Sequence, residues 1–445
     1  MNKTEQFLKS IDSVSKQNFE KKVWDRAKIS LLDYICVTLA GAKYHKQKLQ
    51  NFFEFSEPES GNYTAIGLNK KLVMKEAVFF NGLNGHALDF DDGTNTGIIH
   101  LGSPIFSALL PIAEKYHLTY EKLLKAAIIG YETSFTMALS IQPKHKLLGY
   151  HATGTCGTLG ATIAICYALD FNEDEIKNAF STACVSATGM LKVLDDGSEL
   201  KPYNVAKTSL LALASVQMAK AGFNGHPDAL SGDRGFLKMM TGDANISLKN
   251  TFYKDTFAIE KTYTKPYAAC RYCHPAIEAA ISLRDNYFLE DIKSIDVNTY
   301  SLAVKGHEHT DIPSVSSAKM SIPYGVAVAT ITGKAGLAEY TEHYLNDTKV
   351  KELCKKVTID SNQEFSDVFP EKQIALVKVT TNKGIFQEQV NFPKGEPENR
   401  MTEKEFKNRF MEMCAFAGKT NSDSEKIFNL VNNASGNLDE LFKYL

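Results

Sequence analysis

Apolar residues recur at helical spacing through about the first 260 residues of this 445-residue chain, and this periodicity restricts its possible folds more than any other feature. It predicts helices over residues 21–42, 73–90, 103–116, 120–141, 155–169, 173–191 and 204–222. Runs of small residues within 157–161 and 206–214 suit close packing between helices. The first part of the chain is therefore predicted to form a large all-helical domain.

The pattern changes after about residue 263. A helix is predicted over 274–287 and strands over 292–300, 357–360, 374–381 and 384–390, with residues 382–384 as a hairpin turn. Residues 393–400 resemble a linker, and helical spacing returns over 403–417, 422–432 and 437–444. We predict a mainly α fold with a second α+β domain. Residues 1–264 and 396–445 would form the all-helical domain, and residues 265–395 a smaller α/β lid domain.

The composition is that of a globular protein, with 44% hydrophobic and 23% charged residues. A net charge of −2 gives no general attraction to nucleic acid or to anionic membranes, so any anionic ligand must meet a local basic site. The sequence contains no apolar run of the roughly 20 residues that span a bilayer. It also contains neither a dinucleotide-binding glycine fingerprint nor a P-loop. We expect a cytoplasmic protein without nucleic-acid or membrane partners.

Eight scattered cysteines, mostly in apolar helical surroundings, do not predict a disulfide framework. The segment from Cys270 to His274 has the spacing of a c-type haem attachment motif and of half a zinc site. Because no second cysteine pair accompanies it, we predict neither group there. We expect the two cysteines to pack around Arg271 and His274.

Residues 81–100 hold two histidines and three aspartates where a helix gives way to a glycine-rich loop. Asp89, Asp91 and Asp92 would stand at the negative end of the helix dipole, which disfavours a carboxylate by up to about 1 kcal/mol unless a cation or hydrogen-bond donor compensates. A positive group is therefore expected nearby. Taken alone, the stretch is equally compatible with aspartates that only cap and solubilise a helix end.

Other candidate residues also stand where a loop meets a helix. His151 precedes a helix whose first N–H groups favour an anion, and Lys201 and Tyr324 stand near the starts of two more. Lys265, Arg271 and His274 lie at the predicted domain junction. Each taken singly is more simply a structural histidine or a solvated lysine. Their number at such positions favours an enzyme.

These residues form motifs that resemble the MmgE/PrpD family, in order from about residue 20 to 445. The motifs are Asn81-Gly82, the segment His86 to Asp92, His100 with Ser103-Pro104, Tyr150-His151 with Gly157-Thr158, Lys201-Pro202, and Lys265 to Pro275. The family includes 2-methylcitrate dehydratase, cis-aconitate decarboxylase and iminodisuccinate epimerase. The resemblance implies a helical domain built from both chain ends, an α/β lid and a homodimer. It implies no metal, no iron–sulfur cluster and no organic cofactor.

The resemblance also implies a set of functional residues. Those expected to be catalytic are Asp89, His100, His151, Lys201 and Tyr324, and those expected to bind substrate are Thr94 and Lys265. We add Arg271 and His274, which lie in the same motif as Lys265, as further candidates for binding substrate. Two positions depart from the family pattern. Gly93 separates Asp92 from Thr94, and Asn204 stands where many relatives have a histidine three residues after the lysine.

Members of this family create or discharge negative charge on a carbon next to a carboxylate. Such chemistry needs a base beside the carbon and cations on the carboxylate. Lysines and a bidentate arginine suit the second role, and imidazoles suit proton transfer near neutral pH. The first hypothesis is a cofactor-independent lyase, a dehydratase or decarboxylase, for a small di- or tricarboxylate of the 2-methylcitrate or cis-aconitate type. Alternatives are an epimerase of a substituted succinate and a catalytically silent relative that binds carboxylates.

Overall fold

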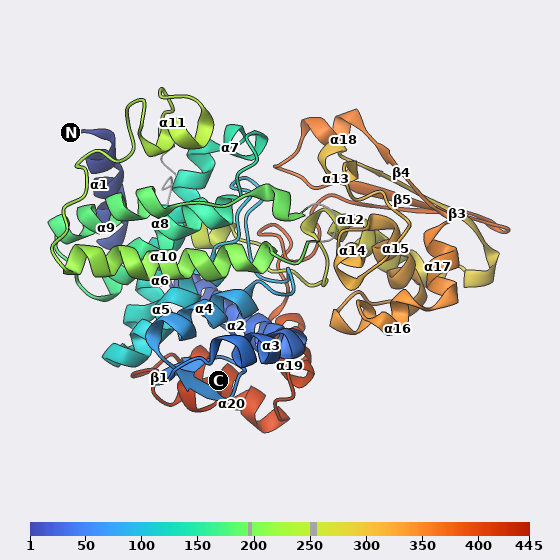
Figure 1. Cartoon of the computed structure of the whole chain (residues 1–445). Coiled ribbons are helices and arrows are strands. Elements are labelled where there is room, and N and C mark those ends of the chain that lie inside the picture. The colour runs from blue at the N-terminus through green and yellow to red at the C-terminus, as the bar shows by residue number, and fades with distance from the viewer. Residues whose placement is uncertain (195–197, 250–255) are drawn as a thin grey trace. The chain divides into compact units, whose positions relative to one another are not determined.

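The fold is mainly α with a small mixed sheet, as predicted (Figure 1). The structure is a computed structural model, and it describes residues 1–194, 198–249 and 256–445. The chain divides into two compact units. The first comprises Met1–Asp195, Leu200–Thr262 and Lys407–Leu445, and the second comprises Asp196–Glu199 and Tyr263–Phe406.

The first unit is built mostly of helices. They are α1 (Lys3–Ser15), α2 (Lys21–Tyr44), α3 (Lys46–Ser56), α4 (Met74–Gly85), α5 (Gly102–Tyr116), α6 (Tyr120–Ile141), α7 (Lys144–Leu147), α8 (Ala152–Ala168), α9 (Glu173–Ser186), α10 (Lys201–Lys220), α11 (Phe236–Thr241), α19 (Glu403–Phe416, which begins in the second unit) and α20 (Asn421–Asn433). This unit is not all-helical, because β1 (Ser60–Ala65) and β2 (Lys70–Leu72) form an antiparallel pair that the sequence analysis missed.

Helix α8 forms the centre of the first unit, and α6 and α10 both pack against it. Nearly every residue of α8 is buried. A Cβ atom added at Gly160 would overlap the Ser134 hydroxyl and the Gly130 carbonyl of α6, so these two helices need glycine where they meet. A Cβ atom at Gly82 of α4 would lie 2.9 Å from Ala206 Cα of α10. This second close approach brings the end of α4 next to the start of α10.

Several helices end earlier than their periodicity predicts. Helix α4 stops at Gly85 instead of Phe90, after Asn84 and Gly85, which are poor helix formers. The chain then turns, and Asp89 adopts a left-handed backbone with φ of +50°. The residues that follow the end of α4 are therefore loop, although their apolar spacing resembles a helix. Similarly, only Leu441–Lys443 of the predicted last helix is helical, as a single 3-10 turn.

The second unit has a four-stranded mixed sheet in the order β4-β3-β5-β6. Strand β3 (Ile292–Thr299) pairs in parallel with β4 (Val357–Ser361) and antiparallel with β5 (Ala375–Thr381), which pairs antiparallel with β6 (Gly384–Val390). Its helices are α12 (His274–Leu283), α13 (Ser301–Val304), α14 (Val315–Lys319), α15 (Ile322–Thr332), α16 (Glu342–Leu345), α17 (Thr348–Cys354) and α18 (Gln363–Asp367). All four strands and the hairpin turn between β5 and β6 occur where the sequence predicts them.

The chain returns to the first unit at Lys407, later than the predicted residue 396. The intervening residues stay with the second unit, where Glu396 is paired with Arg271 and Glu405 with Lys394. Residues 393–400, which resemble a linker in sequence, therefore pack inside that unit.

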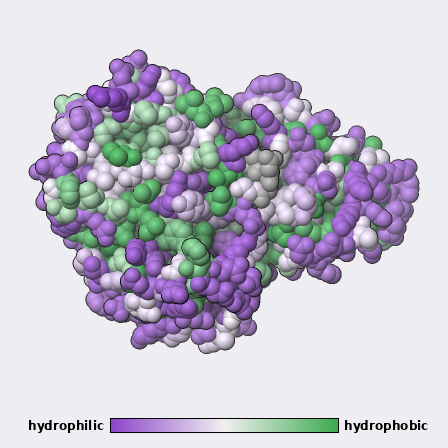
Figure 2. Space-filling view, viewed as in Figure 1, coloured by the Kyte–Doolittle hydropathy of each residue, from purple (hydrophilic) through white to green (hydrophobic). Residues whose placement is uncertain are grey.

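Hydrophilic residues cover much of the surface of the first unit, while hydrophobic residues gather over its middle, around α10 (Figure 2). Exposed apolar side chains of α10 include Tyr203 and Met218. Among the helices of the described residues, none combines the length and hydrophobicity that crossing a bilayer requires.

A buried ion pair holds the C-terminal segment onto the first unit. Arg409 of α19 contacts Asp33 of α2 with 2.6 Å between Nη1 and Oδ1, and its Nη2 donates to the Phe90 carbonyl at 3.0 Å. The side chains of Arg409 and Asp33 are 7% and 2% exposed. Figure 1 shows the red C-terminal helices α19 and α20 near the blue helices α2 and α3, and α20 packs against α2. This pair therefore joins the two chain ends and the loop after α4.

We predict that Arg409→Met lowers the free energy of unfolding by about 3–5 kcal/mol, because it leaves the Asp33 carboxylate buried without its cation. Urea unfolding measures this change. The control is Lys407→Met, on the same helix, whose pair with Glu425 is exposed, and which should cost no more than about 1 kcal/mol. Equal losses in the two variants would contradict the role given to the buried pair.

Candidate active site

The loop between α4 and α5 folds back on itself and brings its charged ends together. Thr94 N–H donates to the Ile99 carbonyl at 2.9 Å, and the Thr94 hydroxyl accepts from Gly97 N–H at 3.2 Å. Asp89 Oδ1 consequently lies 3.6 Å from His100 Nε2. Thr94, which was expected to bind substrate, is 2% exposed and shapes this turn.

Lys201 provides the positive group that the aspartates at the end of α4 were expected to need. It is the first residue of α10, and its Nζ lies 2.7 Å from Asp89 Oδ1. The side chains of His100, Asp89 and Lys201 are 12%, 13% and 18% exposed. These three groups are therefore partly accessible to a small molecule, whereas their neighbours His86 and His151 are buried.

His151 is the residue just before α8, at its N-cap position, and lies beside the same group of residues. Its ring stacks on that of His86, with centroids 6.2 Å apart. Asn204 Nδ2 of α10 lies 3.2 Å from His151 Nδ1. Because an amide NH₂ group can only donate, Nδ1 accepts, and the neutral ring carries its proton on Nε2. Asn204, one of the two departures from the family pattern, thus sets the tautomer of a candidate catalytic histidine.

Burial lowers the pKa of His151 well below its usual value, and the electrostatic effects of the neighbouring His86, Lys201 and His100 act in the same direction. Only Asp89 acts in the opposite direction among the main causes. At neutral pH His151 is therefore an uncharged hydrogen-bond donor through Nε2.

His100 has the opposite tautomer. Its Nδ1 lies 2.8 Å from the carbonyl oxygen of Asp92, which can only accept, so Nδ1 carries the proton. The lone pair of the neutral ring is then on Nε2, the atom that faces Asp89. One imidazole of the cluster is arranged to accept a proton and the other to donate a hydrogen bond.

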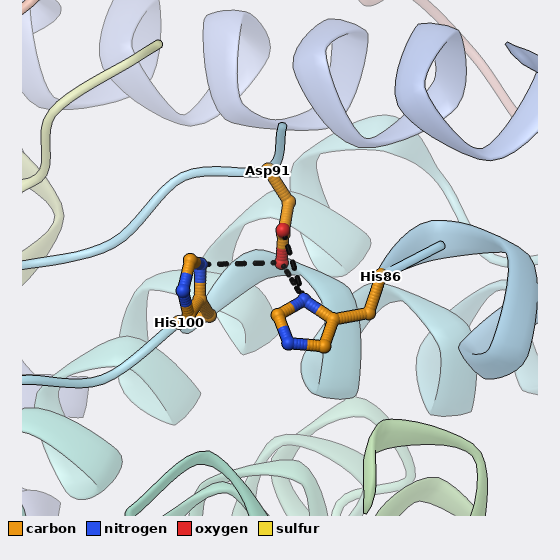
Figure 3. Close-up of side chains that lie close together, drawn as sticks. All are labelled: His86, Asp91 and His100. Atoms are coloured by element: carbon orange, nitrogen blue, oxygen red, sulfur yellow. Dashed lines mark hydrogen bonds and ion pairs between the residues drawn. The ribbon is translucent and has the colours of Figure 1, made fainter. Parts of the chain in front are cut away.

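His86 and Asp91 lie beside His100, with the Asp91 carboxylate between the two rings (Figure 3). His86 Nδ1 is 2.9 Å from both carboxylate oxygens of Asp91, and Ser103 Oγ donates to Asp91 Oδ2 at 2.8 Å. The same oxygen lies 3.5 Å from His100 Nδ1, and the rings of His86 and His100 are 4.7 Å apart. Both residues lie in the motif from His86 to Asp92, but no role was predicted for them.

His86, Asp91 and His100 are also the described residues that could together hold a metal ion, because one ligand atom from each lies within 4.8 Å of the others. Two imidazoles and a carboxylate are ligands that Zn²⁺ and Fe²⁺ accept. Each histidine Nδ1 already donates to an oxygen, however. A metal bound through these atoms would have to replace both hydrogen bonds.

Asp92 is buried deeper and holds the base of the loop. Its carboxylate accepts from the Tyr131 hydroxyl at 2.6 Å and from Gly102 N–H at 2.8 Å. Burial raises its pKa to about 7, and the charge of Asp33 acts in the same direction. This carboxyl group therefore joins α6 to the start of α5.

The remaining predicted site residues belong to the second unit. Arg271 donates through Nε to Glu396 Oε1 at 2.9 Å, contacts the same oxygen through Nη2, and donates through Nη1 to His274 Nδ1 at 2.9 Å. His274 Nε2 donates in turn to the Ala269 carbonyl at 3.1 Å. The carboxylate that Arg271 was expected to take from a substrate is supplied by Glu396. Both residues therefore differ from their expected role as substrate ligands.

Tyr324 and Lys265 are both buried, at 2% and 1% exposure. The Tyr324 hydroxyl, expected to be catalytic, donates to the Glu339 carbonyl at 2.8 Å and so stabilises the packing of α15. The two cysteines near Arg271 are thiols, as are the other six, all of which lie in the described residues. Their neighbour His274 uses both ring nitrogens in protein hydrogen bonds, so it offers no ligand to a haem or zinc.

Comparison with known families identifies the chain. Residues 5–249 match the MmgE/PrpD N-terminal domain, and residues 267–433 match the MmgE/PrpD C-terminal domain. The chain belongs to the MmgE/PrpD family. This confirms the resemblance seen in the motifs from His86 to Pro275. The family's C-terminal domain model extends past Lys407, where the chain re-enters the first unit.

Relatives within the family have a named activity. The chain is 25% identical over 375 residues to a cis-aconitate decarboxylase of Aspergillus terreus, covering 77% of this chain and 75% of the relative. It is 22% identical over 376 residues to the Homo sapiens cis-aconitate decarboxylase, covering 80% and 76%. With the Mus musculus cis-aconitate decarboxylase it shares 22% identity over 433 residues, covering 92% and 86%.

The lowered pKa of His151 predicts a specific pH dependence of stability. Below the ordinary pKa of about 6.5, the unfolded state binds a proton that the folded state does not, so stability falls as the pH falls. Relative to His151→Gln, the wild type should lose up to about 1.4 kcal/mol per pH unit between pH 6.5 and 5. Chemical unfolding at several pH values measures this slope. His117→Gln, which removes an exposed histidine, is the control, and equal slopes for wild type and His151→Gln would refute the prediction.

Proposed function

We propose that this chain is a cofactor-independent lyase that removes carbon dioxide from a small polycarboxylate of the cis-aconitate type. The observation that carries the proposal is the cluster of Lys201, Asp89, His100 and His151, in which a cation and two imidazoles of opposite tautomer meet. The named relatives, all cis-aconitate decarboxylases, favour decarboxylation over dehydration. The cytoplasmic location and the homodimer stay predictions that belong to this proposal.

The reaction moves one electron pair through the substrate. In cis-aconitate, the carboxylate on the methylene carbon leaves as carbon dioxide, and the electrons of the broken C–C bond form a new double bond. The original double bond shifts its electrons onto the carbon next to another carboxylate, and that carbon takes one proton. A trianion and a proton thus become carbon dioxide and an unsaturated dicarboxylate. The enzyme must stabilise the charge on the remaining carboxylate and deliver the proton.

Lys201 and His151 are suited to stabilising the charge that develops on the remaining carboxylate. The Lys201 ammonium group can pair with the carboxylate on which charge develops, while Asp89 holds it in place at 2.7 Å. His151 is uncharged, so its Nε2–H can donate a hydrogen bond to the same charge without releasing its proton. Both groups come from helix starts, of α10 and α8, which adds a favourable dipole for an anion.

His100 is suited to delivering the proton to the carbon. Its Nε2 can accept a proton, and the carboxylates of Asp89 and Asp91 lie 3.6 Å and 3.5 Å from its ring nitrogens. Once Nε2 has taken a proton, these two carboxylates stabilise the transient imidazolium, which can then protonate the carbanion. The substrate-binding roles of Thr94 and Lys265 stay predictions. Arg271, His274 and Tyr324 are left out because their polar atoms are bonded within the second unit.

A reaction survey in heavy water tests the function. The protein, with and without prior chelator treatment, is incubated with cis-aconitate, 2-methylcitrate and substituted succinates and followed by proton NMR. We expect vinylidene protons from cis-aconitate, with one deuterium in the product and no need for added metal. Exchange at a stereocentre without loss of carbon would instead identify an epimerase. Binding of these acids without any change would identify a silent relative.

We predict that Lys201→Met lowers kcat/KM at least about 100-fold, equivalent to about 2.7 kcal/mol of transition-state stabilisation, with little change in Tm. The control is Lys220→Met at the other end of α10, where the ammonium group pairs with Glu175 at the surface. This variant loses the same charge from the same helix and should keep kcat/KM within about twofold. A similar loss in both variants, or none in Lys201→Met, would exclude Lys201 from the reaction.

A further inference from the structure

The orientation of His100 depends on the segment Asp91-Asp92, whose two side chains are held by different parts of the first unit. The Asp92 carbonyl accepts from His100 Nδ1 at 2.8 Å and so fixes its tautomer. The side chains of Asp91 and Asp92, which flank the peptide bond just before this carbonyl, are 1–2% exposed. Since a buried carboxylate is costly without donors, the groups that bind these two side chains also decide where the carbonyl lies.

Asp92 is anchored by α5 and α6, through Gly102 N–H and the Tyr131 hydroxyl. Asp91 is anchored by a different pair of groups, His86 Nδ1 at 2.9 Å and Ser103 Oγ at 2.8 Å. Figure 3 shows the Asp91 carboxylate between the two imidazoles of His86 and His100. Because a carboxylate can only accept, the proton of the His86 ring lies on Nδ1, whereas the Nδ1 proton of His100 is held by the Asp92 carbonyl.

The arrangement resembles the general logic by which a carboxylate orients a catalytic imidazole, with one difference. Asp91 forms its short contact, 2.9 Å, with His86, and a longer one, 3.5 Å, with His100. His86 is 1% exposed and follows directly after the last residue of α4. It therefore ties Asp91 to the end of a helix, and Asp91 places a fixed negative charge behind His100.

We propose that His86 and Asp91 are positioning residues that hold His100 in the tautomer with its lone pair on Nε2. The expected effect of these residues on turnover rests on the proposed function. Their effect on the tautomer of the His100 ring does not. His86 acts here through its Nδ1–H group, by anchoring Asp91. The rest of its ring fills space against His100 and His151.

Two variants of His86 separate its hydrogen bond from its ring. In His86→Asn, the side-chain NH₂ group can occupy the place of Nδ1–H and still donate to Asp91, but the ring is lost. In His86→Phe, the ring volume stays and the donor is lost. Ser103→Ala, which removes the second donor to Asp91, is a milder variant in case His86→Phe folds poorly.

We expect His86→Asn to keep kcat within about threefold of wild type. His86→Phe should lower kcat at least about tenfold with KM within about threefold, and Ser103→Ala should lower kcat by a smaller factor. Nitrogen-15 NMR of histidine-labelled protein provides a readout without turnover. The His100 ring should show a single Nδ1–H tautomer in wild type and His86→Asn, and a mixture of tautomers in His86→Phe.

Each other outcome would overturn the proposal. Retained activity in His86→Phe with loss in His86→Asn would mean that the ring acts by packing. An unchanged His100 tautomer in all three variants would mean that the Asp92 carbonyl is fixed without Asp91. Loss of wild-type activity on chelation, with return on adding Zn²⁺ or Fe²⁺, would assign the three residues to a metal site. If the wild type turns over no polycarboxylate, the proposed function fails, and the NMR result still decides the role of His86.

Discussion

The structure around the site depends on the burial of aspartates in the loop after α4. Asp91 and Asp92 are 1% and 2% exposed, and each must therefore receive hydrogen bonds from the protein. The donors come from the end of α4, the start of α5 and the middle of α6. These helices are thus tied to one loop, and the loop places His100. The close contact of α4 with α10 at Gly82 then brings Lys201 to the same place.

Charge and burial divide the residues of the cluster into two groups. Asp89, His100 and Lys201 keep some solvent exposure, while His86, Asp91 and His151 have almost none. Burial beside Lys201 keeps His151 uncharged and a hydrogen-bond donor, whereas His100 lies between the carboxylates of Asp89 and Asp91 with the lone pair of its neutral ring on Nε2. The two histidines therefore differ in what Nε2 can do: it donates a hydrogen bond in His151 and accepts a proton in His100. The difference comes from the surrounding charges and hydrogen-bond partners.

Much of this architecture could be predicted from the sequence, because helical periodicity and strand alternation report burial directly. Motifs also predicted that Asp89, His100, His151 and Lys201 matter, and the structure places these four together. The roles expected for Arg271 and Tyr324 depend on partners distant in sequence, Glu396 and the Glu339 carbonyl, which no local pattern reveals. No role was predicted for His86 or Asp91 for another reason: apolar spacing extended the predicted helix to Phe90 and hid the turn at Asp89, which brings the two side chains together.

Asn204 shows how one departure from the family pattern changes the chemistry available to the site. A histidine at this position could donate to His151 or accept from it, depending on its own protonation, and the tautomer of His151 would then vary with pH. An amide does not titrate, and as a donor at 3.2 Å it keeps His151 Nδ1 as an acceptor. His151 is thereby confined to donating through Nε2. Within the cluster described here, the proposed proton transfer then falls to His100, and the proposed function makes turnover depend on the orientation of that one ring.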